Sequence, residues 1–397
     1  MKGNKVTYLD GVRGAAALAV VIAHYLQVFV PAVFENRPEL SHFAWDRIVP
    51  KTPLNVLFNG NFAVCLFFVL SGYVLSYKFF RMKDRRIVMA GFVKRYFRLA
   101  VPAFVSVLLA YLVMVNGWGY YDKVRNLTMA TMPDPYMVIP GIPELLKQGL
   151  YHTFFTYGMA YNPVLWTMTY ELFGSFIIFG MLLIAGTFRF RYLLYIAGIL
   201  WFHDSYYLGF WLGLLLSDLA NSRSGSRIRI HSKVLLACLT AAGIYLGSYP
   251  YVDPAGTVYG WLPIGGGLLT NAIAYRTIGA FLLLAVMLSS RLGQKMFASR
   301  PLEYLGRVSF SLYLVHFAVL CSFSSLLFLH LSDRLAYGWN VLLTTAVSMP
   351  LIFILAHLMY IGVDGPIVRL LSRINFRPSR PQVSGARQAG SKSFRQS

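Results

Sequence analysis

The first apolar segment of the chain carries three residues whose types and spacing could do chemistry. Arg13 and His24 lie eleven positions apart, which in an α-helix is almost three turns and about 16 Å along one face. Asp10 falls within about 40° of the same face. A titratable imidazole near the middle of a bilayer is costly to maintain, so His24 is a candidate functional residue. The alternative is a histidine that only forms a hydrogen bond between two helices.

Glu171 is expected at a similar depth on another helix. That helix enters from the opposite side at Asn162-Pro163, which places Glu171 about 12 Å from that surface. His24 lies about 16 Å from the side of Arg13, and the two estimates meet across a hydrocarbon layer of about 30 Å. The sequence therefore allows a buried pair of carboxylate and imidazole, provided that the two helix faces point toward each other.

Further polar residues reach the same layer. Ser71 and Gly72 together interrupt an apolar segment. Ser309 and His316 lie seven positions apart and therefore on one helix face, with Tyr313 on the adjoining part. Small and hydroxylated residues in membrane helices commonly serve helix packing, which is the alternative for Ser71. His316 is either a wall of an active site or a partner in an interhelical hydrogen bond.

Basic residues collect on the side where Arg13 lies. Lys94, Arg95 and Arg98 precede another apolar segment on neighbouring turns. There they could bind phosphate groups electrostatically and in bidentate fashion. The alternative is the ordinary excess of positive charge on the cytoplasmic side of a membrane protein. Because Arg13 begins a helix that carries a buried histidine, a phosphorylated donor could bind its head group at this rim and extend its reactive end inward.

The elements that must position these residues are predicted to be membrane-spanning helices. The 397-residue chain is 57% hydrophobic and 13% charged, and its apolar residues form long blocks rather than amphipathic stripes. We therefore predict an all-α polytopic membrane protein, embedded in the lipid bilayer, with about ten transmembrane helices. The expected spans are residues 12–33, 56–77, 99–115, 164–186, 191–202, 205–220, 234–249, 267–290, 308–329 and 341–362.

The distribution of charge predicts the orientation of these spans. Most of the net charge of +21 falls in segments that a cytoplasmic N-terminus places inside. Both termini are then cytoplasmic, and nucleic acid is not an expected partner. Residues 116–163 form a long outer loop that could cap an acceptor cleft or be an unstructured connector. Residues 371–397 are predicted to be a basic disordered cytoplasmic tail. Cys65, Cys238 and Cys321 lie in apolar segments without the spacing of a metal site.

Five segments, taken in order, carry a family resemblance. They are Leu9-Asp10-Gly11-Val12-Arg13-Gly14 with His24, Phe67-Phe68-Val69-Leu70-Ser71-Gly72-Tyr73, Lys94-Arg95-Tyr96-Phe97-Arg98-Leu99 with Pro102, Trp166-Thr167-Met168-Thr169-Tyr170-Glu171, and Ser309-Phe310-Ser311-Leu312-Tyr313-Leu314-Val315-His316. Together they resemble the acyltransferase 3 family of integral-membrane O-acyltransferases, from about residue 6 to residue 370. Where the family commonly has Glu-x-Pro near its end, this chain has Asp364-Gly365-Pro366.

The resemblance implies a transmembrane acyltransferase domain over residues 1–370. It would transfer an acyl group, commonly acetyl, from cytoplasmic acyl-coenzyme A to a hydroxyl of a carbohydrate, lipid or small molecule. Acyl-coenzyme A is then a substrate, and no bound cofactor or metal is expected. The membrane would be the inner membrane of a bacterium or an endomembrane of a eukaryote.

The resemblance also implies roles for individual residues. His24 would be the catalytic base or a transient acyl carrier, and Glu171 and Trp166 would polarise or shape the acceptor side. A neutral imidazole positioned by a carboxylate can take the proton of an attacking hydroxyl. The residues placed at coenzyme A phosphates are Arg13, Lys94, Arg95 and Arg98, and further candidates for substrate binding are Asp10, Ser71, Tyr313 and His316.

A transporter or flippase is the alternative from another class, with His24 and Glu171 as a proton relay. The short segments at 191–202 and 205–220 are compatible with it. Against it, the sequence shows no pair of matched halves of the kind many transporters carry. A non-catalytic membrane scaffold would leave the layer of buried polar residues unexplained.

Overall fold

The computed structural model describes residues 7–35, 37–137, 141–221, 230–251, 254–262 and 268–373, with the backbone alone for 268–271. All regular secondary structure in these ranges is helical, which confirms the all-α prediction. The long helices are α1 (Thr7–Phe29), α3 (Gly60–Met82), α4 (Arg85–Val115), α8 (Trp166–Ala185), α12 (Leu268–Ser289), α14 (Arg300–Val319) and α16 (Tyr337–Met359). The shorter ones include α2 (Ala32–Glu35), α5 (Tyr121–Thr128), α6 (Ile142–Lys147), α7 (Thr153–Phe155), α9 (Arg191–Trp201), α10 (Tyr207–Asn221), α11 (Lys233–Gly247), α13 (Arg291–Phe297), α15 (Ser325–Ser332) and α17 (Gly365–Ser372).

Seven helices in the described ranges are long and apolar enough to cross a membrane. All ten predicted spans contain helix, but α9, α10 and α11 are only 11, 15 and 15 residues long. At about 1.5 Å per residue they reach roughly 16–23 Å, less than a hydrocarbon layer of about 30 Å. The described chain therefore has the character of an integral membrane protein with seven candidate spans, where the sequence predicts about ten.

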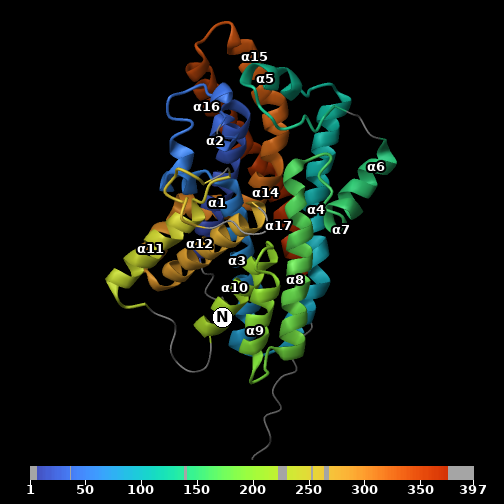
Figure 1. The fold of residues 1–397 in the computed structure, drawn as a ribbon. Coiled ribbons are helices and arrows are strands. Elements are labelled where there is room, and N and C mark those ends of the chain that lie inside the picture. The colour runs from blue at the N-terminus through green and yellow to red at the C-terminus, as the bar shows by residue number, and fades with distance from the viewer. Residues whose placement is uncertain are drawn as a thin grey trace, which may run out of the picture.

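Helix α3 packs against α1, α4, α8, α10 and α12 and so holds the two sides of the bundle together (Figure 1). Its crossing with α10 depends on glycine. A Cβ added at Gly72 would lie 2.2 Å from the carbonyl oxygen of Phe210, and one added at Gly213 would lie 2.1 Å from that of Val69. Two helices can approach this closely only where side chains are absent.

Helices α1 and α14 meet in the same close manner. A Cβ at Gly306 would lie 2.1 Å from the carbonyl oxygen of Asp10, and one at Gly14 would lie 2.5 Å from the backbone nitrogen of Gly306. This contact sets the register of the two helices. As a result, Arg13 lies beside the first turns of α14.

Helix α4 begins earlier than predicted. Asp84 caps it by accepting a hydrogen bond from the backbone nitrogen of Arg86, and the helix continues for 31 residues. The expected span 99–115 covers only its second half, because the basic residues before it are good helix formers and contain no break. Lys94 and Arg98 thus lie inside the helix, roughly 14–20 Å from its start, rather than at its entry.

The predicted outer loop 116–163 is folded in its described parts and contains α5, α6 and α7. The backbone nitrogen of Tyr120 donates to the carbonyl oxygen of Cys321 at 2.9 Å, which attaches the start of α5 to the π-helical turn η6 (Leu320–Ser324) that follows α14. Further along, the backbone nitrogen of Tyr157 donates to Oγ1 of Thr169 at 3.2 Å. In Figure 1, α5 lies at the same end of the bundle as α2 and α15. An unstructured connector is therefore excluded for these parts of the loop.

The predicted tail is described only at its beginning. Residues 371–373 complete and follow α17, and residues 374–397 lie outside the described ranges. The disorder predicted for this segment stays a prediction.

Candidate active site

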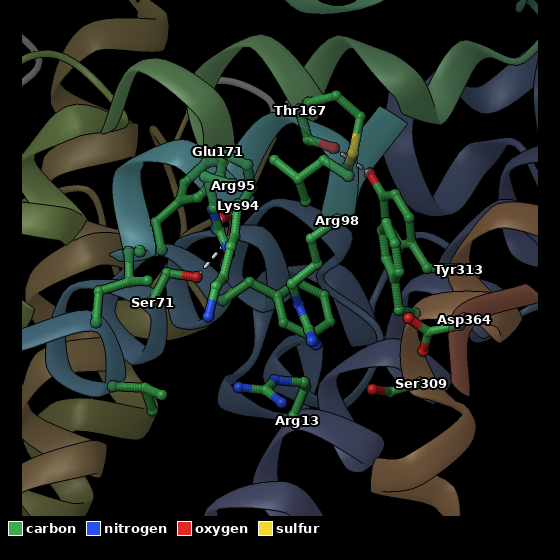
Figure 2. A pocket seen from close by; sticks show the side chains of 18 of the residues that line it. Arg13, Ser71, Lys94, Arg95, Arg98, Thr167, Glu171, Ser309, Tyr313 and Asp364 are labelled. Carbon is green, nitrogen blue, oxygen red and sulfur yellow. Dashed lines mark hydrogen bonds and ion pairs between the residues drawn. The ribbon is translucent and has the colours of Figure 1, made fainter. Parts of the chain in front are cut away.

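A cavity of about 680 Å³ lies between α1, α3, α4, α8 and α14, and Figure 2 shows its polar lining. The cationic lining residues are Arg13, Lys78, Lys94, Arg95, Arg98 and Arg307, and the acidic ones are Glu171 and Asp364. In Figure 2 the side chains of Lys94, Arg98 and Arg13 point toward the same space from two helices. This excess of positive charge in a hollow favours an anionic ligand.

The carboxylate of Glu171 joins three helices at one wall of the cavity. Arg95 of α4 forms an ion pair with Oε2 of Glu171, and Oγ of Ser71 on α3 donates to Oε1 at 2.8 Å. The side chains of Arg95 and Glu171 are only 12% and 13% exposed. Ser71 therefore belongs to the site, while its neighbour Gly72 provides the packing contact with α10.

The structure does not form the pair of Glu171 and His24 that the sequence allows. The partner of His24 is His316 of α14, whose Nε2 lies 3.0 Å from Nδ1 of His24. His316 is fully buried, whereas His24 keeps part of its surface accessible. The ring of Phe317 stands edge-on to that of His24, with the centroids 5.5 Å apart.

Glu171 and the histidine pair also lie at different depths. Thr167, one turn before Glu171, contacts Tyr313, and His316 follows Tyr313 by almost one turn. Rises of about 1.5 Å per residue put the histidines roughly 10 Å further along the bundle than Glu171. The sequence gives His24 and Glu171 the same depth from helix rises alone, whereas in the structure Arg13 and Glu171 line the same cavity and His24 lies three turns beyond Arg13.

Tyr313 is shared by the cavity and the histidine pair. It lines the cavity, and its ring centroid lies 6.1 Å from that of His316. Its hydroxyl donates to the carbonyl oxygen of Val164 at 2.8 Å and lies 2.9 Å from Oγ1 of Thr167. Neither histidine is among the described residues that line the cavity. Tyr313 therefore forms a wall between the two parts of the site.

Besides the two histidines, two more predicted residues, Asp10 and Trp166, lie outside the lining. Oδ1 of Asp10 lies 3.6 Å from Nη1 of Arg13, so Asp10 orients a lining residue. Trp166 belongs to an aromatic cluster, with its ring centroid 5.0 Å from that of Tyr206 and 5.8 Å from that of Tyr170. The predicted residues that the structure does bring to the cavity are Arg13, Ser71, Lys94, Arg95, Arg98, Glu171 and Tyr313.

The sequence does not assign a role to five polar residues of the cavity, namely Lys78, Thr167, Arg307, Ser309 and Asp364. Lys78 and Arg307 directly flank predicted spans, and this position was a signal that they lie near the bundle. Asp364 ends the π-helical turn η7 (Tyr360–Asp364) and is 6% exposed. Its Oδ1 has no hydrogen-bond partner among the described residues. Within the described ranges, no three His, Cys, Asp or Glu side chains form a group that could hold a metal ion.

These features define a class of protein, namely a polytopic helical membrane protein with a cationic cavity and a neighbouring histidine pair inside its bundle. Comparison with known proteins gives its family. The family model described as an acyltransferase domain matches residues 6–360. The chain therefore belongs to the acyltransferase 3 family, and it is an acyltransferase that transfers groups other than amino-acyl groups.

Three relatives are similar to most of the chain. Acyltransferase clz18 of Cochliobolus lunatus is 23% identical, over 81% of this chain and 84% of its own length. O-acetyltransferase PaAT-1 of Phomopsis amygdali is 24% identical, over 79% and 72%. Acyltransferase R4 of a Phoma species is 23% identical, over 85% and 86%. No solved structure gives a significant match. The family membership leaves the transporter alternative without support.

Proposed function

We propose that this acyltransferase transfers an acyl group from acyl-coenzyme A to a hydroxyl of a carbohydrate, lipid or small molecule. The acyl group that we propose is acetyl. The observation that carries the proposal is the cationic cavity beside the histidine pair. It combines a site suited to a phosphorylated donor with a group that can take a proton. The choice of acetyl is supported by the name of one relative, an O-acetyltransferase.

The donor's phosphates would bind to the cations that point into the cavity. Arg98, Lys94 and Arg13 reach into one space, and guanidinium groups bind phosphate oxygens in bidentate fashion. Arg95 is held by Glu171, so it adds positive charge to the wall and keeps a fixed position. The partnerless oxygen of Asp364 suits an N–H or O–H group of the donor's arm.

The donor would enter from the cytoplasm. The positive-inside rule assigns the basic end of the bundle, near the start of α4, to that side. The same assignment places both termini there. The acceptor would then approach the histidine pair from the opposite end, where Trp166 and Tyr170 lie in their aromatic cluster.

His24 is the proposed catalytic base, because it is the accessible member of the histidine pair. The hydroxyl oxygen of the acceptor attacks the carbonyl carbon of the thioester while its proton passes to His24. The tetrahedral intermediate then collapses, the carbon–sulfur bond breaks, and the leaving thiolate takes the proton from His24. The products are the acyl ester and free coenzyme A, and general-base catalysis of this kind contributes about 10²–10⁴-fold in rate.

The test measures release of free coenzyme A from acetyl-coenzyme A by purified protein, with candidate hydroxyl acceptors present. We expect His24→Ala to lower the rate by about 10²-fold or more in a sample that remains folded. His330→Ala is the matched control, because His330 is an exposed histidine on α15, and it should keep the wild-type rate. Equal rates in the wild type and His24→Ala would remove the base assignment. No release from several acyl donors by a folded wild type would contradict the donor assignment.

A further inference from the structure

We propose that His316 is a positioning residue that fixes which nitrogen of His24 accepts the proton. The inference rests on the proposed function, because it concerns how His24 acts as a base. It starts from two contacts of the His316 ring. Nδ1 lies 3.1 Å from the carbonyl oxygen of Leu312, and Nε2 lies 3.0 Å from Nδ1 of His24. Since His316 is 0% exposed, bulk water does not compete for either nitrogen.

These two contacts determine the positions of the hydrogens. A carbonyl oxygen only accepts, so Nδ1 of His316 carries the hydrogen that binds Leu312. A neutral imidazole has one N–H, which leaves Nε2 of His316 as an acceptor. The hydrogen in the second contact therefore comes from Nδ1 of His24. Nε2 of His24 is left with the lone pair, and it is the nitrogen that can take a proton.

The fold holds the His316 ring in this orientation. Leu312 lies one turn before His316 on α14, so the first contact stays within one helix. The second contact depends on the register of α1 and α14, which the close approach of Gly14 and Gly306 sets. Phe317 stands edge-on to both rings, at centroid distances of 5.5 Å from His24 and 6.3 Å from His316.

The tautomer matters for the transfer step. The acceptor's proton goes to Nε2 of His24 as its oxygen bonds to the thioester carbon, and the same proton goes to the thiolate when the carbon–sulfur bond breaks. Throughout, Nδ1–H of His24 stays hydrogen-bonded to Nε2 of His316. The backbone carbonyl of Val20, one turn before His24, also accepts a hydrogen bond from the His24 ring, so His316 acts together with it. Without His316, one acceptor fewer holds the hydrogen on Nδ1, and the form of His24 with its hydrogen on Nε2 becomes more populated. That form has no lone pair on Nε2 to receive the proton.

Two substitutions separate this role from a merely structural one. His316→Asn can keep an amide N–H for the Leu312 carbonyl, but it is too short to reach His24. His316→Gln can place an amide oxygen near the former Nε2, where it can accept from His24. We expect His316→Asn to lower kcat by about 10²-fold or more at an unchanged KM for acetyl-coenzyme A, and His316→Gln to restore at least about tenfold. The control is Val315→Ala, which removes packing from a neighbouring buried residue and should leave kcat unchanged.

Nitrogen-15 NMR of protein labelled at histidine reads the tautomer of His24 without turnover. The expected result is Nδ1–H in the wild type and a mixture of tautomers in His316→Asn. Wild-type kcat in folded His316→Asn, or an Nε2–H form of His24 in the wild type, would overturn the inference. If the wild type releases no coenzyme A, the proposed function fails, and the NMR measurement still decides whether His316 sets the tautomer.

Discussion

Removing the carboxylate of Glu171 should destabilise the protein mainly through the arginine that it leaves behind. Glu171→Ala leaves Arg95 in a place where its side chain is 12% exposed, and Ser71 loses its acceptor. Breaking a fully buried ion pair from one side costs about 3–5 kcal/mol. Because this pair borders a cavity that can admit water, we expect a loss of about 2–3 kcal/mol in the free energy of unfolding.

A double variant also removes the charge of Arg95, which Glu171→Ala leaves without its partner. Arg95→Met with Glu171→Leu replaces the pair by apolar side chains, and such replacements are commonly neutral or stabilising. We therefore expect the double variant to unfold near the wild-type temperature, well above Glu171→Ala. Thermal unfolding in detergent, followed by intrinsic fluorescence, measures this coupling.

An exposed ion pair provides the control. Asp122 lies 3.9 Å from Arg125 with its side chain 54% exposed, so Asp122→Ala should change the free energy of unfolding by less than about 1 kcal/mol. If Glu171→Ala unfolds at the wild-type temperature, or if the two replacements reduce stability additively, Glu171 does not serve as the counter-ion of Arg95.

Two further substitutions test the donor site and the helix contact. Arg98→Gln should raise the apparent KM for acetyl-coenzyme A about tenfold or more, since a hydrogen bond to a charged group is worth about 1.5–3 kcal/mol. Steady-state kinetics measure this KM. A change only in the KM for the acceptor would contradict the assignment of Arg98 to the donor. Gly306→Ala should lower the unfolding temperature, because the added Cβ would lie 2.1 Å from the carbonyl oxygen of Asp10. Its control is Gly180→Ala, whose Cβ meets no described atom within 4 Å. That substitution should stabilise α8 by up to about 1 kcal/mol. If Gly306→Ala and Gly180→Ala change the unfolding temperature equally, the α1–α14 contact is not tight.

The presence of a cationic site could be predicted from the sequence. An arginine or lysine at the edge of a long apolar segment costs free energy if it enters the hydrocarbon layer. For that reason the sequence singles out Arg13, Lys94, Arg95 and Arg98. The sequence predicts only part of their helical context, because charge before an apolar segment is typical of the membrane surface. In the structure, Lys94, Arg95 and Arg98 lie well inside α4.

The partners of each polar residue could not be predicted. A sequence places residues on a helix face, but the rotation and register of that helix depend on contacts elsewhere. Here Gly14, Gly72 and Gly306 decide which faces meet, and a glycine in an apolar segment does not reveal its partner helix. This is why His24 pairs with His316, and Glu171 with Arg95, although depth alone favours a pair of His24 and Glu171.

The shortness of α9 has a consequence for the surrounding lipid. Eleven residues extend roughly 16 Å, about half of a hydrocarbon layer of about 30 Å. Its surface is nevertheless apolar, with Leu193, Leu200 and Trp201 64%, 67% and 80% exposed. A helix of this length that faces lipid would be accompanied by a thinner bilayer beside it or by polar solvent at its end. The end of α9 adjoins Tyr207, the neighbour of Tyr170 in the aromatic cluster, so a polar acceptor would have less hydrocarbon to cross on this flank than on any side lined by a full-length span.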